Sequence, residues 1–543
     1  MTQLADNLCG AFISTVTHGL NRASAKKCSI WAEQYRKIKG KPWSFRLRPW
    51  TKEMHDSTAT HNIGQKAAQM AYTETVLNKT FHAIDVNGYD VLYVLPSQQP
   101  DAKDFSVTRF DPAINESEHL SQIFSSVQNV GLKQARTGCV YIRGSRSRSQ
   151  LKSIPVAFLV LDEVDEFSEE AIALATERLS GQETRQEWDI STPSIPDRGI
   201  NQLYQASTQE HFFFTCPYCN RHTELTFPES LVITAEHHLE KRVEDSHIIC
   251  KECKHILPHE DKPTFLANGQ WQSTDNLDAS TRGFYINQLY SSTVTPADIA
   301  TKYLKSFDSI VAEQEFYNSK IGVPHIPKGS QITDENINAL LGDFKNGDNR
   351  FLSGFLTMGV DVGTFLHVSI MNWTFDHSPG NINAKAIGRL AYCLKVETFQ
   401  ELYDLVIQFK PQAGVIDAHP EKRLALDFIR QFPGVFYVCF YGNKQQKNEI
   451  NGTDEAVTVD RTTWLDSFLG RFKNGRIRLP KDLSLEYREH IKAMIRTPKK
   501  DEEGNIYFKY LKSKADHYAH SGNYAEIALR ITDGFGAHET VDW

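Results

Sequence analysis

The chain has 543 residues, of which 40% are hydrophobic, 11% aromatic and 23% charged, so it has enough apolar material for several packed cores. This composition excludes an intrinsically disordered protein. A net charge of -7 excludes a globally basic DNA-binding protein, so nucleic acid could be held only by local patches. No stretch approaches the roughly 20 apolar residues of a membrane span, so we expect a soluble, intracellular protein with no membrane partner.

The first part of the chain is predicted to form a helical leader and then an α/β domain. Residues 1–45 are the leader, because Trp31 to Ile38 has amphipathic spacing. Beyond residue 60, short apolar runs alternate with helical stretches, which favours a parallel sheet. These runs lie at 91–95, 140–142, 156–161 and 188–191. We assign 46–350 to this domain and interpret its polar, Gly- and Pro-bearing end, 325–350, as a linker.

The segment VAFLVLDEVDE places two carboxylates, Asp162 and Glu163, at the end of a buried apolar strand. In the Walker B pattern of nucleotide hydrolases, the first carboxylate organises Mg²⁺ and the second polarises the attacking water. An acidic helix N-terminus, stabilised by the helix dipole, is the alternative interpretation. The pattern indicates an ATPase with a phosphate-binding loop upstream.

The candidate phosphate-binding loop is 66–73, KAAQMAYT. Compared with G-x-x-x-x-G-K-[ST], the loop keeps Thr73, whereas Lys66 and Ala71 replace the two glycines and Tyr72 replaces the lysine. A lysine at the start of the loop can still reach phosphate oxygens, because its charge lies at the end of a flexible side chain. Ala71 places a Cβ where the loop is expected to need a positive φ.

Two further features fit a nucleotide-driven motor. WDISTP places Ser191 and Thr192 at a strand end, where translocases carry a motif that couples hydrolysis to movement, although an ordinary Ser-Thr-Pro turn is an alternative. Residues 136–161 are basic and contain no acid, so they could supply an arginine finger to a neighbouring subunit or track phosphates. The arginine-finger candidates are Arg143, Arg146 and Arg148.

Two C-x-x-C pairs predict a zinc module within 211–275. Cys216 and Cys219 (CPYC) are separated by 30 residues from Cys250 and Cys253 (CKEC). In a reducing compartment, such pairs favour a metal over disulfides. Four thiolates form a closed tetrahedral Zn²⁺ site, so the expected role of the metal is structural.

A second α/β domain is predicted over 351–543. Three successive apolar runs are followed by helix, strand, helix and strand, which is the order of a ribonuclease H-like fold. Asp361 ends the first strand, Asp417 ends the fourth, and Asp516 opens the last amphipathic helix. Carboxylates at these places can hold two Mg²⁺ or Mn²⁺ ions for phosphodiester cleavage, with His419 and His517 as supporting candidates. Each aspartate alone could instead be a strand-end or helix-capping residue.

KAAQMAYTE, LVLDEVDEF, STP, the cysteine pairs, GFYINQLYSS (283–292) and FYNSKIGVP (316–324) occur in one order. This order resembles that of the large terminase subunit of tailed phages, in its lambda-like branch, over roughly 30–530. The resemblance implies that Lys66, Gln69 and Thr73 hold phosphates and Mg²⁺, that Asp162 holds Mg²⁺, and that Glu163 is catalytic. It also places the nuclease carboxylates at Asp361, Asp417 and Asp516.

The fold expected from these features is a P-loop NTPase domain with a parallel sheet and an inserted zinc ribbon, followed by a ribonuclease H-like nuclease domain. The expected function is a viral packaging motor that uses ATP to pump double-stranded DNA into a procapsid and cuts concatemers. Its expected partners are DNA, a small terminase subunit, the portal and further copies in a ring, in the cytoplasm of an infected bacterium. A restriction- or repair-type helicase with a non-catalytic C-terminal domain, and a zinc-ribbon DNA-binding adaptor with a decayed ATPase, are the alternatives.

Overall fold

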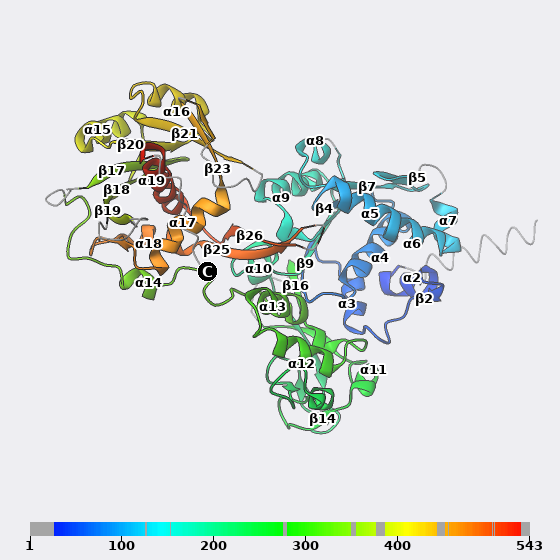
Figure 1. Cartoon of the computed structure of the whole chain (residues 1–543). Helices are drawn as coiled ribbons and strands as arrows, with labels where there is room; N and C mark the ends of the chain where they lie inside the picture. The colour runs from blue at the N-terminus through cyan, green and yellow to red at the C-terminus, as the bar shows by residue number, and fades with distance from the viewer. Residues whose placement is uncertain are drawn as a thin grey trace, which may run out of the picture. The chain divides into compact units, whose positions relative to one another are not determined.

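The computed structural model divides the chain into two compact units, Met1–His325 and Ile326–Trp543 (Figure 1). The residues that the structure describes are 26–124, 128–152, 154–274, 280–348, 354–375, 386–442, 451–453, 455–501, 503 and 505–533. Most of the predicted leader, 1–25, lies outside them. The predicted helix near Trp31 is α2 (Cys28–Tyr35), and the short antiparallel strands β1 (Lys37–Ile38) and β2 (Lys41–Pro42) follow it.

The first unit is built on an 11-stranded sheet, in the order β11-β10-β16-β3-β9-β8-β4-β7-β6-β5, with β15 paired to β10. Neighbours from β10 to β7 along this order are parallel. The strands are β3 (His61–Lys66), β4 (Val91–Leu95), β5 (Gln128–Asn129), β6 (Leu132–Gln134), β7 (Cys139–Gly144), β8 (Phe158–Asp162), β9 (Gln186–Ser191), β10 (Glu210–Thr215), β11 (His222–Thr223), β15 (Gln270–Ser273) and β16 (Thr281–Ile286). The predicted parallel sheet is therefore present.

Helices cover this sheet, and α4 (Tyr72–Asp85) follows β3 directly. One face of α4 is apolar and buries Val76, Phe81 and Ile84 in the largest core cluster of the unit. The other α-helices are α3 (Trp50–Asp56), α5 (Lys103–Phe105), α6 (Asp111–Asn115), α7 (Glu118–Ile123), α8 (Arg148–Leu151), α9 (Glu169–Thr176), α10 (Gly199–Gln205), α11 (Lys262–Phe265), α12 (Pro296–Lys305) and α13 (Ile310–Glu315).

The predicted zinc module is a small group of hairpins inserted between β10 and β15. A separate three-stranded antiparallel sheet is formed there by β12 (Leu231–Val232), β13 (His247–Ile249) and β14 (Ile256–Leu257). One cysteine pair lies in the turn between β10 and β11, and the other lies in the turn between β13 and β14.

The second unit contains an eight-stranded sheet in the order β22-β23-β21-β20-β17-β18-β19-β24. Strands β17, β18 and β19 are antiparallel, whereas β17, β20 and β21 are parallel, as the ribonuclease H-like order requires. The strands are β17 (Phe355–Val362), β18 (Leu366–Phe375), β19 (Ala386–Val396), β20 (Ala413–Asp417), β21 (Phe436–Gly442), β22 (Asn451–Thr453), β23 (Ala456–Asp460) and β24 (Ile477–Arg478). A two-stranded ribbon is added by β25 (Met494–Lys500) and β26 (Ile506–Lys512).

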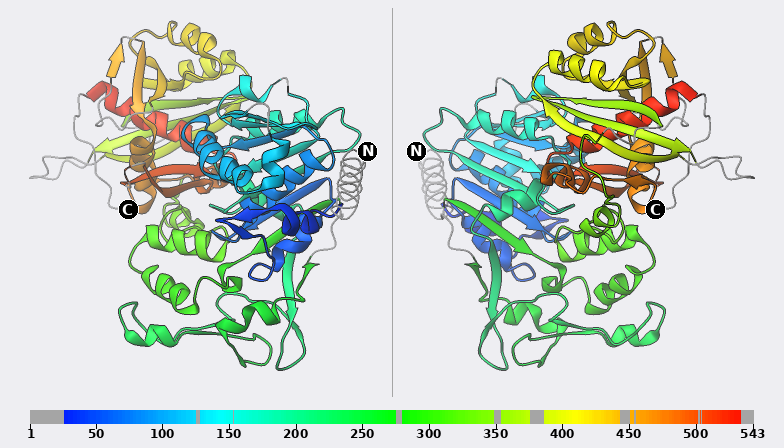
Figure 2. Two further views of the ribbon diagram at one scale, coloured as in Figure 1. Left: turned by 90° about the vertical axis from the view of Figure 1, so that its right-hand side faces the viewer. Right: turned by 90° about the vertical axis from the view of Figure 1, so that its left-hand side faces the viewer.

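Helix α19 (His517–Asp533) packs against β17, β18 and β20, and it is the red helix that lies against the yellow-green strands in Figure 2. Gly359 on β17 allows this close approach, because a Cβ there would lie 1.9 Å from the backbone oxygen of Ser521. The remaining α-helices are α14 (Asp334–Asn338), α15 (Phe399–Phe409), α16 (Lys422–Ile429), α17 (Arg461–Lys473) and α18 (Leu485–Lys492).

The segment predicted as a linker, 325–350, contributes side chains to the second unit. The second unit begins at Ile326, and Ile332, Ile337 and Leu340 lie in its core with exposed fractions of 4% or less. The backbone of Leu341 pairs with that of Leu479. Much of this segment is therefore part of the second unit, because its few apolar residues are buried there.

None of the helices in the described part of the chain combines the length and the apolar character that crossing a bilayer requires.

Candidate functional site

The loop between β3 and α4 is the predicted phosphate-binding loop. β3 ends at Lys66 and α4 begins at Tyr72, so the segment lies between a strand and a helix, as expected. Gln69 and Ala71 have positive φ angles of 60° and 64°. Ala71 takes the position of the second glycine of the general motif, and its backbone is left-handed. Glycine adopts this conformation freely, whereas alanine adopts it at a cost of about 1 kcal/mol.

Contacts from distant segments fix this loop. The indole of Trp50 donates to the backbone oxygen of Met70 at 3.0 Å. The side-chain amide of Gln288 donates to the backbone oxygen of Ala68 at 2.7 Å. The N–H of Ala68 donates to the oxygen of Ser319 at 2.8 Å. Gln288 and Ser319 belong to the two downstream motifs, 283–292 and 316–324, so these motifs support the loop. Sequence reasoning missed the part played by Trp50, which no local pattern indicates.

Tyr72 stands where the general motif has its lysine. Its ring is buried under the loop, 2.7 Å from where a Cβ on Gly64 would lie, and its hydroxyl donates to the backbone oxygen of Phe284 at 3.4 Å. The side chain is thus part of the core, and it offers no charge to a phosphate.

Lys66 supplies the positive charge of the loop. Its side chain is 7% exposed, and its Nζ lies 3.1 Å from Oε1 of Glu163 and 3.5 Å from the hydroxyl of Thr192. Glu163 directly follows β8 and is 43% exposed, with a left-handed φ of 64°. A non-glycine residue in this conformation is held by its surroundings, here by a backbone hydrogen bond from Glu163 to Ile190 at 2.8 Å.

The predicted coupling residues contact the predicted catalytic carboxylate directly. The Ser191 hydroxyl donates to Oε2 of Glu163 at 3.2 Å, and the N–H of Thr192 lies 3.5 Å from the same atom. Ser191 ends β9, the strand that lies between β3 and β8 in the sheet. The loop, the predicted catalytic carboxylate and the predicted coupling residues therefore form one hydrogen-bonded group.

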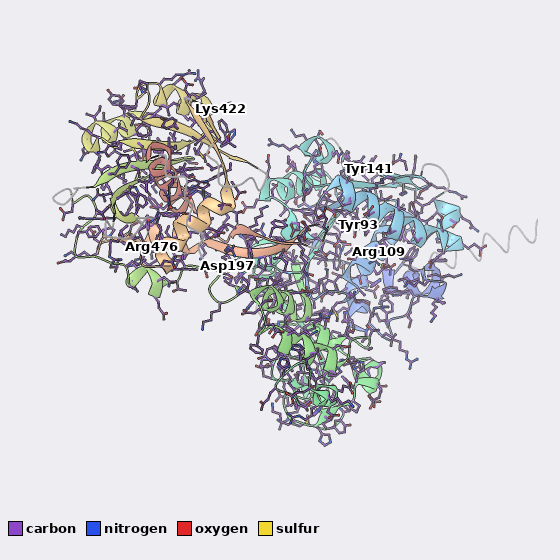
Figure 3. The ribbon with its side chains drawn as sticks, in the orientation of Figure 1. Tyr93, Arg109, Tyr141, Asp197, Lys422 and Arg476 are labelled. Carbon is purple, nitrogen blue, oxygen red and sulfur yellow. The ribbon has the colours of Figure 1, made fainter. Side chains whose placement is uncertain are left out.

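Asp162, at the end of β8, has the surroundings of a cation ligand. The Tyr93 hydroxyl, on the residue labelled in Figure 3, donates to its Oδ2 at 2.7 Å, while its buried Oδ1 makes no hydrogen bond with any described residue. Burial and the neighbouring charge of Glu163 raise the pKa of Asp162 to about 6, and the Lys66 charge and the nearby Thr73 hydroxyl act in the opposite direction. A buried carboxylate oxygen beside a threonine hydroxyl fits Mg²⁺.

The three arginine-finger candidates have different surroundings. Arg143 on β7 donates to the backbone oxygens of Gly131 and Ile142 and lies over the ring of Tyr141. Arg148 is paired with Glu170. Arg146 is exposed, so it is the candidate best placed to reach another molecule.

The four cysteines of the predicted zinc module come together. Their sulfur atoms all lie within 4.8 Å of one another, and Sγ of Cys216 is 3.9 Å from that of Cys253. Asn220 and Lys254, with positive φ angles of 57° and 62°, close the two turns. Burial opposes ionisation of Cys250, but hydrogen bonds from the N–H groups of Cys253 and Glu252, together with those of the neighbouring thiols, lower its pKa to about 7. This donor set fits tetrahedral Zn²⁺.

The predicted nuclease carboxylates lie at the ends of neighbouring elements. Asp361 and Asp417 follow the paired residues Val360 and Ile416 on the parallel strands β17 and β20. Burial raises the pKa of Asp417, and the charge of Asp361 adds to this effect. The backbone N–H of His419, a predicted supporting residue, donates to Oδ1 of Asp417 at 3.0 Å. The contact between this histidine and the carboxylate is therefore made by its backbone.

Asp516 precedes α19 and lies among cations. It is 3.2 Å from Nε2 of His520, 3.5 Å from Nζ of Lys512 and 3.9 Å from a guanidinium nitrogen of Arg461. Burial would raise the pKa of Asp516, but the hydrogen bond from His520 and these charges hold it well below its usual range. Among the described residues, Asp361 forms a group with His367 and His517 in which one potential metal-ligand atom of each residue lies within 4.8 Å of the others. This group includes neither Asp417 nor Asp516.

Two histidines adjoin Asp361. Nδ1 of His517 lies 2.8 Å from its Oδ2, and the ring of His367 stacks on that of His517 at 4.4 Å with an interplanar angle of 12°. Rings stacked in this way lie in separate planes, so both cannot direct an in-plane nitrogen at one ion. No local sequence pattern marks His367 as a site residue, and the antiparallel register places it opposite Asp361 on β18.

Comparisons with known proteins agree with this architecture. The family model "Phage terminase large subunit gpA, ATPase domain" matches residues 37–271. The model "Terminase large subunit gpA, endonuclease domain" matches 281–405, and the first part of that match, up to His325, belongs to the first compact unit. No curated protein sequence matches the chain significantly.

Solved structures of large terminases resemble the chain at low sequence identity. The large terminase of bacteriophage HK97 is 12% identical with a TM-score of 0.51, and the match covers 93% of this chain and 99% of that one. The large terminase of the thermophilic bacteriophage D6E is 11% identical with a TM-score of 0.32, over 90% and 100% of the two chains. The similarity to the HK97 protein supports the fold, and the two family models identify the domains.

The chain therefore belongs to the gpA family of phage terminase large subunits, and it is a DNA-packaging enzyme with an ATPase domain followed by an endonuclease domain.

Proposed function

We propose that the ATPase site consists of Lys66, Gln69, Thr73, Asp162 and Glu163. The observation that carries this proposal is the contact of Lys66 with Glu163, because it joins the phosphate loop to the carboxylate that would orient water. Lys66 takes the place of the lysine that the loop lacks at Tyr72. Thr73 and Asp162 would hold Mg²⁺, which when bound neutralises charge on the phosphate oxygens.

In this site, Glu163 positions the attacking water and accepts its proton. Ser191 and Thr192, which contact Oε2 of Glu163, are the residues that would sense the loss of the terminal phosphate and pass the change to β9. Arg146 is the residue we assign to act on the nucleotide of a neighbouring copy, because Arg143 and Arg148 already have partners in their own unit.

We further propose that Asp361, Asp417 and Asp516 hold the divalent ions of the endonuclease, which are Mg²⁺ or Mn²⁺. The ends of β17 and β20 place two of these carboxylates side by side, and α19 begins next to the third. The bound ions would activate water and stabilise the leaving oxygen. His517 keeps Asp361 oriented through its 2.8 Å contact.

We also propose the structural metal, the substrate, the partners and the location of the packaging machine. Zn²⁺ on the four cysteines would stabilise the inserted module. Double-stranded DNA is the substrate, the small terminase subunit and the portal of a procapsid are the partners, and several copies form a ring on that portal. The site of action is the cytoplasm of the infected bacterium.

One experiment tests both activities on the full-length chain. We expect double-stranded DNA to stimulate ATP hydrolysis, and we expect Mg²⁺ or Mn²⁺ to support nicking of the same DNA without ATP. Absence of DNA-stimulated hydrolysis would contradict the motor site, whereas absence of nicking would contradict only the nuclease site.

A further inference from the structure

A second group of metal-ligand side chains lies in the first unit, toward the N-terminal ends of the central strands β3 and β9, whereas the phosphate loop follows the C-terminal end of β3. His61 begins β3, and Glu187 and Asp189 lie on the neighbouring strand β9, with His61 paired to Glu187 in the parallel register. One potential ligand atom from each residue lies within 4.8 Å of the other two. Neither the ATPase site nor the cysteine module uses these residues.

The two carboxylates of this group are buried and incompletely bonded. Asp189 is 1% exposed and Glu187 is 6% exposed. Oδ2 of Asp189 lies 2.8 Å from Nε2 of His61, and Oε1 of Glu187 accepts from the Thr176 hydroxyl at 2.8 Å. The other oxygen of Asp189, Oδ1, is buried and has no hydrogen-bond partner among the described residues.

The surroundings of these carboxylates favour a bound cation. Along β8, the residues paired with Glu187 and Asp189 are Leu159 and Leu161, and both leucines are fully buried. Two carboxylates this close in an apolar environment repel each other unless a cation or a proton compensates.

We propose that His61, Glu187 and Asp189 bind one divalent transition-metal ion, such as Mn²⁺, Fe²⁺ or Zn²⁺. One imidazole with two carboxylates is a mixed nitrogen and oxygen set, which suits these ions better than it suits Ca²⁺ or Mg²⁺. The ring of His61 is 30% exposed, so an ion can enter from solvent. Oδ1 of Asp189, which accepts no hydrogen bond from the described residues, can supply a further ligand.

This site would join β3 to β9 at their N-terminal ends. The C-terminal ends of the same strands carry Lys66 and Ser191. An ion bound here would therefore stabilise the pair of strands that supports the ATPase site, without touching nucleotide. Its existence does not depend on the residues that we assign to ATP hydrolysis or to DNA cleavage.

The test is equilibrium dialysis of the full-length protein against Mn²⁺ without nucleotide, with bound metal counted by elemental analysis. Mn²⁺ is the probe because thiolates of the cysteine module bind it poorly. Asp361→Ala serves as the parent, so that fewer ions bind at the nuclease site. His61→Gln and Asp189→Asn are compared with this parent, and His325→Gln, which alters a 2.7 Å pair with Glu313 in the same unit, is the matched control.

We expect each of His61→Gln and Asp189→Asn to lose about one bound Mn²⁺ per chain relative to the parent and to His325→Gln. Mn²⁺ should raise the melting temperature of the parent and of the control, and this increase should disappear in the two variants. His61 is partly exposed, so His61→Gln keeps the test valid if Asp189→Asn does not fold. Equal metal counts in the parent and in His61→Gln would overturn the proposal. In that case, His61, Glu187 and Asp189 would be stabilised by a shared proton and not by a metal ion.

Discussion

Nζ of Lys66 lies 3.1 Å from Oε1 of Glu163, although 97 residues separate them in the sequence. The carboxylate is 43% exposed, so the pair adds at most about 1 kcal/mol to stability. The pair matters for where the two charged groups lie, because Lys66 is the one cation in the loop 66–73. A terminal phosphate that attracts Lys66 would release Glu163, so we expect nucleotide binding and positioning of the catalytic carboxylate to be linked.

Glu163→Gln should leave ATP binding nearly unchanged and lower hydrolysis by at least about a hundredfold. Glutamine keeps the size of the side chain and its hydrogen bonds to Ser191, but it cannot accept the proton of water. Binding is measured with a fluorescent nucleotide, and hydrolysis is measured as released phosphate. Unchanged turnover would rule out the assigned role of Glu163.

Lys66→Ala should weaken nucleotide binding by about tenfold or more, because it removes a charge-assisted contact to phosphate. Tyr72→Phe is the matched control at the position where a lysine normally stands. It removes only the 3.4 Å hydrogen bond to Phe284, so affinity should hardly change. A strong effect of Tyr72→Phe together with a weak effect of Lys66→Ala would mean that the loop is assigned wrongly.

Cys250→Ser should release about one Zn²⁺ per chain and locally unfold the module at 211–275, because binding of the metal drives the folding of such sites. Bound zinc is measured by elemental analysis, and local unfolding by limited proteolysis. Cys439→Ser, at a buried cysteine of the second unit, is the control that should retain zinc. A purified parent protein that contains no zinc would refute this assignment.

His55 should make the first unit less stable in acid. Its ring is buried between the backbone oxygen of Thr51, 2.7 Å from Nδ1, and the amide of Asn78, 3.0 Å from Nε2, and burial lowers its pKa to about 3. The unfolded chain binds a proton near pH 6.5 and the folded chain does not, so stability falls as pH drops below 6.5. Between pH 7 and pH 5 the loss from this residue is about 2 kcal/mol.

This loss is measured by urea unfolding of the full-length protein at pH 7 and pH 5. His55→Gln should be less stable at pH 7 but should show a smaller difference between the two pH values. An undiminished difference would mean that other groups cause the acid sensitivity.

The sequence predicts those parts of the structure in which local pattern and burial agree. The apolar run before Asp162 is strand β8, and the three runs before residue 397 are β17, β18 and β19. Strand β3, by contrast, has the sequence HNIGQK, whose only strongly apolar side chain is Ile63. Its polar side chains are buried because distant groups accept their hydrogen bonds, such as Gly322 for Gln65. No window of sequence contains that information.

The burial of the segment 325–350 is not predictable from its sequence, for a related reason. Ile332 and Ile337 stand singly among polar residues and Leu340 lies in the short run 339–341, so the segment has the composition of a loop. Each of these side chains nevertheless fills a place in the core of the second unit. The stacked pair His367 and His517 likewise depends on the register of β18 and on the packing of α19, which only the folded chain defines.

The packed segment changes where a nuclease fragment should begin. A fragment of Ile326–Trp543 should fold and cut DNA with Mg²⁺ or Mn²⁺ in the absence of ATP. A fragment of 351–543 lacks Ile332, Ile337 and Leu340, whose burial contributes roughly 5 kcal/mol, so it should be largely unfolded. Circular dichroism and thermal melts compare the two fragments. Equal stability would show that the segment contributes nothing to this core.

Asp361→Ala in the full-length chain should abolish DNA cleavage and change DNA-stimulated ATP hydrolysis little. The variant removes a proposed anionic ligand of the nuclease ions, whereas the groups assigned to ATP lie on the separate sheet of the first unit. Asp427→Ala on α16 is the matched control, because this carboxylate is 58% exposed and its removal should spare both activities. Nicking of plasmid DNA and release of phosphate are measured on the same preparations, with a thermal melt to show that each is folded. If a folded Asp361→Ala protein lost both activities, the two sites could not be independent, and one site shared by the two units would have to replace them.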